Sequence, residues 1–171
     1  MLRKEYLETV RDRVIERGVP CADSHILECL KYLAIISQTS GRRIAVTPDV
    51  DEVWHELIVQ TQSYHLLCAG LPGGKYLHHE SITPAAYSER VGGNEFAAEF
   101  LRWVPDYVQS FGDFTPERAR HWTVISFLTS EVGMSLAEIN ALGRESQADS
   151  VIDDDSAWRA LAKDNLGLVT S

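Results

Sequence analysis

Cysteine is scarce in this chain of 171 residues: Cys21, Cys29 and Cys68 are the only three, and none forms a Cys-x-x-Cys pair. The lack of such a pair excludes the common cysteine-based zinc motifs. Any disulfide pairing would leave one cysteine over, so we expect reduced thiols and a cytoplasmic protein.

Long apolar runs are also missing, since no segment approaches the roughly 20 apolar residues that cross a bilayer. The first seven residues mix charged and apolar side chains too closely for the apolar region of a signal peptide. We therefore expect no membrane partner.

Basic residues are few, because 16 Lys and Arg stand against 25 Asp and Glu, which gives a formal net charge of −9. A nucleic-acid-binding face is usually basic, and the one basic cluster here is Arg42-Arg43. This acidic protein is therefore not expected to bind nucleic acid. The acidic run Asp153-Asp154-Asp155 is interpreted as a solvated linker ending in a helix cap, with a partner-binding patch as the alternative.

Repeats and convincing strand patterns are absent too, whereas helix signals are frequent. Thr-Pro at residues 47–48, 83–84 and 115–116 is typical of helix starts, because threonine caps a helix and proline tolerates its first position. The sequence predicts one all-α domain over residues 1–171, a compact bundle of about six to seven helices with irregular Gly- and Pro-rich loops. The expected helices cover residues 2–17, 23 or 24 onward, 48–69, 84–91, 95–111, 116–132, a short helix after the Ser135–Glu138 capping box, and a last helix from Asp155 or Ser156.

The predicted helix 48–69 carries the most informative pattern. On a helical wheel its core face consists of Val50, Val53, Leu57, Tyr64 and Cys68, with Trp54 and Thr61 at the edge. The opposite face, expected to meet water, consists of Glu52, Glu56, Gln60 and Ser63. Trp54 and Tyr64 are interpreted as structural residues of the core.

His55 lies at the boundary of these faces, one helical turn after Asp51. The i, i+4 spacing brings a carboxylate to an imidazole. Such a pair suits a metal ligand or a proton-transfer group, and it also suits an ordinary structural hydrogen bond. Both interpretations stay open at this point.

A second pair of histidines follows the glycine-rich break at residues 70–74. Because neighbours in an extended segment point to opposite sides, one of the pair can face His55. The result is a candidate site for zinc or iron, although its spacing matches no standard zinc signature. Its candidate ligands are Asp51, His55, His78 and His79, and the weaker candidates are Gln62, His65 and Cys68. The alternative is that both loop histidines only pack the loop against the helix.

The same segment carries a wider pattern. It consists of Val-Asp-x-x-Trp-His at residues 50–55, Tyr-x-x-x-Cys at Tyr64 and Cys68, and Gly-x-x-x-His-His from Gly74 to His79. This pattern resembles the glycine-rich domain-containing protein-like family, as a short, bacterial-type member. Weaker likeness extends it to about residues 20–125 and involves Glu28, Lys31, Tyr32 and Leu33 upstream and Tyr107, Phe111, Gly112 and Trp122 downstream. Residues from about 135 to 171 would then form a helical extension.

The chain departs from the family pattern at three points. Leu67 replaces an aromatic residue before the cysteine, Glu80 replaces a proline after the histidine pair, and the glycine-rich tail is missing. The resemblance implies a site in this segment without naming its chemistry. Nucleic-acid-binding and stress-related roles of plant members rely on segments that this chain lacks.

Three functions compete on this evidence, and the sequence does not decide whether the chain is an enzyme. The favoured one is a module that binds a protein or peptide, because the chain is acidic and shows no complete catalytic set. The alternative is a metal-binding protein or metal-dependent enzyme that uses Asp51, His55 and His78 or His79. The weakest has Cys68 as a nucleophile, because this residue lies on the core face with no activating cation nearby.

Overall fold

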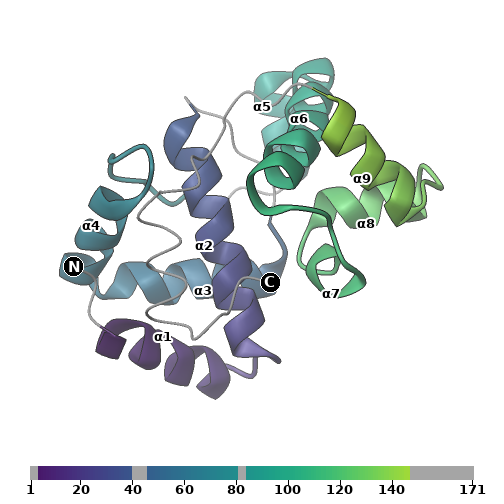
Figure 1. The fold of residues 1–171 in the computed structure, drawn as a ribbon. Coiled ribbons are helices and arrows are strands. Elements are labelled where there is room, and N and C mark those ends of the chain that lie inside the picture. Colours follow the sequence, from purple (N-terminus) through teal and green to yellow (C-terminus); the bar gives the residue numbers. More distant parts are fainter. Residues whose placement is uncertain (1–3, 40–45, 81–83, 147–171) are drawn as a thin grey trace. The chain divides into compact units, whose positions relative to one another are not determined.

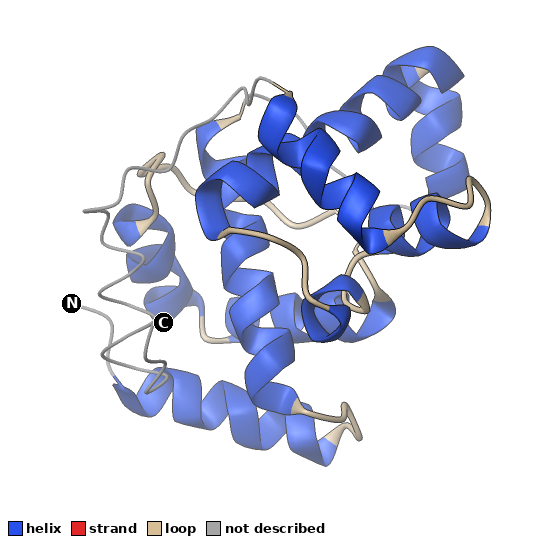
Figure 2. Cartoon of the chain, turned by 45° about the vertical axis from the view of Figure 1, so that its right-hand side comes forward, coloured by secondary structure: helices blue, strands red, loops and turns tan. Residues whose placement is uncertain are grey.

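The computed structural model describes residues 4–39, 46–80 and 84–146. Within these ranges the chain forms helices α1 to α9 and no strand, which confirms the all-α class (Figures 1 and 2). No helix in the described part is long and apolar enough to cross a membrane. The Arg42-Arg43 pair, the acidic run at 153–155 and the last predicted helix lie outside the described residues.

The described residues gather in two compact units. The N unit comprises residues 4–38 and 48–79, and the C unit comprises mainly residues 84–146. The expectation of a single domain stays a prediction.

Four helices build the N unit, in the order α1 (Lys4–Glu16), α2 (Ala22–Gln38), α3 (Pro48–Val59) and α4 (Thr61–Gly70). Helix α2 packs against both α1 and α3, and α3 also packs against α1 and α4. Thirteen of the 17 residues of α2 are buried, so this helix forms the centre of the unit. The Tyr6 hydroxyl joins α1 to α3 by donating to the Leu57 carbonyl at 2.7 Å.

The single helix predicted over residues 48–69 is in fact two helices, with a break at Gln60. Gln60 has φ −91° and ψ 71°, which is not a helical conformation. The predicted core face is nevertheless confirmed on both pieces, whereas Thr61 at its edge is exposed. The buried residues of this face are Val50, Val53, Trp54, Leu57, Tyr64 and Cys68.

Glu56 corrects the predicted water-facing side of this segment. Its side chain is buried, because Arg17, directly after α1, places its Nε 2.6 Å from Glu56 Oε1. The same Nε lies 3.0 Å from Glu52, which is partly exposed. A helical wheel gives the side of the helix on which Glu56 lies, but it does not show that Arg17 covers this side chain.

The C unit is built around α6 (Gly93–Phe111), which packs against α5 (Pro84–Val91), α8 (Thr123–Ser130) and α9 (Leu136–Glu145). The predicted helix 116–132 is interrupted, so that short α7 (Pro116–Ala119) precedes α8. The predicted capping box at Ser135 and Glu138 is present at the start of α9. An aromatic cluster fills the core and consists of Trp103, Tyr107, Phe114 and Trp122.

Candidate metal centre

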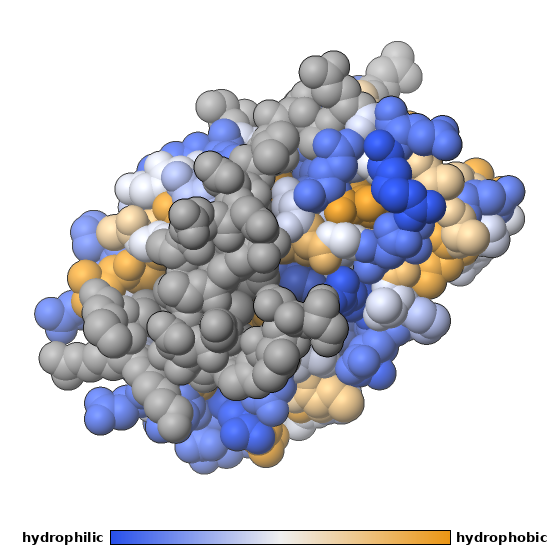
Figure 3. Space-filling model, in the orientation of Figure 1, coloured by the Kyte–Doolittle hydropathy of each residue, from blue (hydrophilic) through white to orange (hydrophobic). Residues whose placement is uncertain are grey.

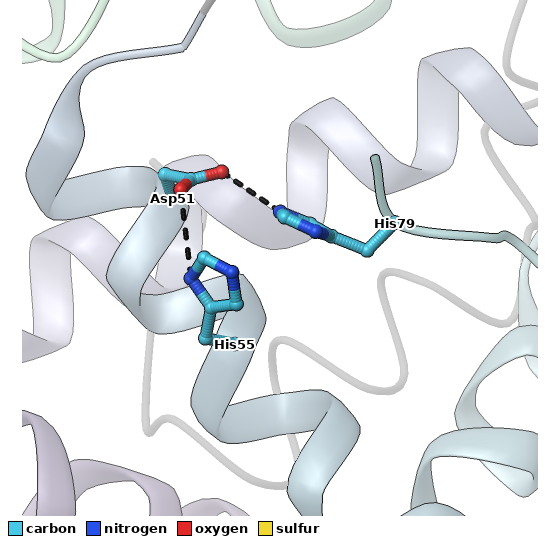
Figure 4. A group of neighbouring side chains, drawn as sticks. All are labelled: Asp51, His55 and His79. Atoms are coloured by element: carbon cyan, nitrogen blue, oxygen red, sulfur yellow. Dashed lines mark hydrogen bonds and ion pairs between the residues drawn. The ribbon is translucent and has the colours of Figure 1, made fainter. Parts of the chain in front are cut away.

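Three side chains of the N unit converge on one point (Figure 4). His79 Nε2 lies 2.8 Å from Asp51 Oδ1, and His55 Nδ1 lies 3.5 Å from Asp51 Oδ2. One donor atom from each of the three residues lies within 4.8 Å of the other two. Asp51 therefore stands between two imidazole rings, whose centroids are 4.3 Å apart.

Helix α3 supplies two of the three groups. It begins at Pro48, after Thr47, so that Asp51 lies in its first turn and His55 one turn later. A carboxylate is favoured in the first turn of a helix, because the N-terminal N–H groups carry a partial positive charge. The side-chain exposures are 33% for Asp51 and 43% for His55, so both groups reach solvent.

His79 is held against α3 through its packing on Trp54. The two ring centroids are 4.4 Å apart in an edge-to-face arrangement, and Trp54 is itself buried. Trp54 also packs against Tyr32 of α2, with ring centroids 5.4 Å apart. The His79 side chain is only 10% exposed, so its ring has little freedom to turn away from Asp51.

Tyr64 fixes the loop that carries His79. Its hydroxyl accepts a hydrogen bond from Trp54 Nε1 at 2.9 Å and donates one to the Leu77 carbonyl at 2.7 Å. In one continuous helix Trp54 and Tyr64 would stand about 15 Å apart along the axis, because each residue rises 1.5 Å. The break at Gln60 is therefore what allows the two side chains to meet.

Two further contacts hold the loop. The Gly73 N–H donates to Ser37 Oγ at 3.1 Å, which ties the glycine-rich turn to the end of α2. The Leu77 backbone donates a hydrogen bond to the thiol of Cys68. Residues 73 to 79 are thus anchored at both ends, although they form no helix or strand.

His78 points the other way. It is exposed and lies against exposed Tyr76, with ring centroids 4.9 Å apart. Because Leu77 is buried, the extended backbone turns His79 inward and His78 outward. The expectation that one of the two histidines faces His55 is met by His79.

The weaker candidates lie outside this cluster. Gln62 and His65 are exposed on α4, and the His65 ring lies 5.9 Å from that of Tyr76. Cys68 is buried, and its burial raises the pKa of its thiol, so that the neutral form is favoured. A neutral, enclosed thiol does not suit a nucleophile, which must be an accessible thiolate.

No protein-family model, curated protein or solved structure matches this chain. The resemblance to the glycine-rich domain-containing protein-like family therefore stays a prediction. The structure does give the residues of that pattern distinct positions. Asp51, His55 and His79 form the cluster, whereas Trp54, Tyr64 and Cys68 hold the loop that brings His79 to it.

The separations within the cluster can be compared with those of a metal site. In a tetrahedral centre with bonds of roughly 2.0–2.2 Å, neighbouring donor atoms lie about 3.3–3.6 Å apart. The 3.5 Å between His55 Nδ1 and Asp51 Oδ2 lies within that range, and the 2.8 Å between His79 Nε2 and Asp51 Oδ1 lies below it. Without a metal, the same atoms form a network in which the His79 Nε2–H donates to the carboxylate.

The contacts of Ser37 with Gly73 and of Tyr32 with Trp54 cannot be predicted from the sequence alone. Ser37 contacts a residue 36 positions away, and no local pattern reports such a pairing. In contrast, the sequence does indicate which of His78 and His79 points toward the cluster. Buried Leu77 predicts by alternation that His79 shares its side of the extended segment.

Proposed function

We propose that the N unit binds one divalent transition-metal ion, zinc or iron, through Asp51, His55 and His79. The observation that carries the proposal is the mutual approach of three donor atoms to within 4.8 Å. Two imidazoles and one carboxylate form a common donor set for both ions. The ion would replace the proton between His79 and Asp51, so that ligand positions already present need only small adjustments.

The surroundings of the cluster support this proposal over a purely structural network. His79 is held by Trp54 and its loop by Tyr64, so that one ligand is fixed before any ion arrives. Such outer contacts orient metal-bound histidines in proteins. A hydrogen-bonding network alone would not need the second ring on this carboxylate, because His55 is 43% exposed and water can satisfy its ring.

The test compares two adjacent histidines. Full-length protein purified without a histidine tag would be analysed for bound metals and titrated with Zn²⁺ and with Fe²⁺ under anaerobic conditions. We expect one ion per chain in the wild type, and loss of that ion in His79→Ala and in Asp51→Asn. The matched control is His78→Ala, which removes an exposed histidine of the same loop and should keep the ion.

Two results would contradict the proposal. One is a wild type without metal that also fails to bind either ion at micromolar concentrations. The other is equal loss of binding in His78→Ala and His79→Ala, because this would mean that surface histidines bind the ion nonspecifically. Circular dichroism of each variant separates loss of the site from loss of the fold.

The favoured prediction from the sequence, a module that binds a protein or peptide, stays a prediction. On the face drawn in Figure 3, hydrophobic residues form patches among hydrophilic ones. The large exposed hydrophobic residues of the N unit are Ile15, Val59, Leu66 and Tyr76.

A further inference from the structure

Helix α4 is largely accessible to solvent although it carries no charge. The segment from Leu57 to Gly74 contains no Asp, Glu, Lys or Arg, whereas 24% of the whole chain is charged. Only three of the ten residues of α4 are buried, namely Tyr64, Leu67 and Cys68. Burial in the N unit therefore does not account for the missing charges.

The outer side of α4 forms an uncharged face together with the loop. At about 100° per residue, four exposed positions of the helix fall within an arc of about 100°, and these are Gln62, His65, Leu66 and Ala69. The loop extends this side, because the ring centroid of Tyr76 lies 5.9 Å from that of His65 and 4.9 Å from that of His78. We call these six residues the α4 face.

The α4 face has the composition of an interface core. Such cores are poor in charged residues and rich in aromatic side chains, tyrosine in particular. Here Tyr76 lies against two imidazole rings, and it also packs edge-on against the buried ring of Tyr64, with centroids 5.4 Å apart. Tyr64 holds the loop through the Leu77 carbonyl. The exposed rings are thus positioned before any contact forms, so that association loses less conformational entropy.

Charge distinguishes between the possible partners of this face. A net charge of −9 makes copies of this chain repel one another. At the α4 face two copies can meet without bringing acidic side chains together, and the charged residues that border it along the loop, Lys75 and Glu80, have opposite signs. A partner with a basic surface would instead be attracted to the acidic parts of the chain.

We propose that two copies of this chain associate through the α4 face. The contact is isologous, so each copy contributes the same residues. One helix face and a short loop make a small interface, and we expect a dissociation constant in the micromolar range. The inference does not depend on the proposed metal site, because none of the six residues belongs to its ligands.

Sedimentation velocity of the full chain tests this proposal at concentrations from about 1 to 300 µM, with EDTA present. We expect a monomer–dimer equilibrium whose dissociation constant falls as NaCl is raised, because salt screens the repulsion between the acidic copies. Leu66→Glu should raise the dissociation constant at least about tenfold, since it places an unpaired charge in the contact. Ala69→Glu, at another exposed position of the α4 face, should act in the same direction.

The matched control is Leu101→Glu on α6. Leu66 and Leu101 are 49% and 47% exposed, and both substitutions add one negative charge to each copy. The control should therefore associate like the wild type, and circular dichroism checks that all three variants keep their helices.

Three results would contradict the proposal. A wild type that stays monomeric at every concentration would mean that a second copy is not the partner of this face. Equal effects of Leu66→Glu and Leu101→Glu would mean that the contact lies elsewhere or responds only to net charge. A dimer that forms with added Zn²⁺ and disappears in EDTA would be a metal bridge between surface histidines.

Discussion

Tyr64 joins three parts of the N unit through a single hydroxyl group. The oxygen accepts from Trp54 of α3 and donates to the carbonyl of Leu77, two residues before His79. Burial raises the pKa of Tyr64, so the hydroxyl keeps the proton that it donates. Tyr64 is not one of the candidate metal ligands drawn in Figure 4, yet it holds the loop that carries His79.

This arrangement predicts the effect of Tyr64→Phe. The change keeps the buried ring but leaves the Trp54 Nε1–H and the Leu77 carbonyl without their partner, which should lower the free energy of unfolding by roughly 1–3 kcal/mol. Metal affinity should fall by about 10-fold to 100-fold, as for the loss of other groups that orient a ligand. Chemical denaturation and Zn²⁺ titration measure the two effects.

A control separates positioning from general destabilisation. Tyr6→Phe removes another buried hydroxyl of the same unit, the one that donates to Leu57, and should lower stability without changing metal affinity. Equal affinity losses in the two variants would show that Tyr64 acts only through stability.

At the scale of elements, the glycine-rich turn is packed against the end of α2. A Cβ atom added at Gly73 would overlap the Ser37 carbonyl oxygen, so no side chain fits there. The Gly73 N–H also donates to Ser37 Oγ. A glycine is required here because of this close approach of two backbones.

We therefore predict that Gly73→Ala moves the loop away from α2. The expected costs are about 1–3 kcal/mol of stability and a weaker metal site, because His79 lies six residues further along the same loop. The matched variant is Gly70→Ala at the end of α4, where an added Cβ meets no atom within 4 Å. Thermal melts and metal titrations of both should differ only for Gly73→Ala, and equal behaviour would mean that the loop tolerates the displacement.

The helices were largely predictable from the sequence because their signals are local. Apolar spacing, Thr-Pro starts and the capping box at Ser135 each depend on residues within one or two turns. The break at Gln60 was not predictable, because neither glycine nor proline marks it. The break accompanies the contact of Trp54 with Tyr64, ten residues further along the chain, which a continuous helix would not allow.

The candidate site was predictable to a similar degree. Asp51 and His55 follow from i, i+4 spacing, and a loop histidine was expected to join them. Gln62, His65 and Cys68 lie outside the cluster because the direction of α4 changes after the break. That direction depends on tertiary packing, which the local sequence does not show. For the same reason a helical wheel could not predict that Arg17 buries the side chain of Glu56.

At the scale of the whole molecule, several weak acids are buried in their neutral form. Burial is the largest cause that raises the pKa of Tyr6, Cys29, Tyr64 and Cys68. Their ordinary values are 9.0 for the thiols and 10.0 for the phenols. In the folded chain these protons are retained, whereas the unfolded chain releases them at the ordinary values.

The sign of the resulting pH dependence follows from this difference. Below about pH 8 both states are protonated at these groups, so their contribution to stability is complete and constant. As the pH rises through 9 and then 10, these groups lose protons only in the unfolded state. Their ionisation stabilises the unfolded state relative to the folded one. The free energy of unfolding should therefore fall, by up to about 1.4 kcal/mol per pH unit for each group involved.

Thermal or urea denaturation at pH 7, 8, 9 and 10 tests this expectation. In a Cys29→Ala, Cys68→Ala double variant the fall should begin nearer pH 10, because only the two phenols then remain. Cys21→Ala is the control, since Cys21 is exposed and its removal should leave the profile unchanged. A stability that stays constant to pH 10 would contradict the prediction, as would a double variant that keeps the wild-type profile, because either result would mean that the buried thiols ionise as readily in the folded chain as in the unfolded one.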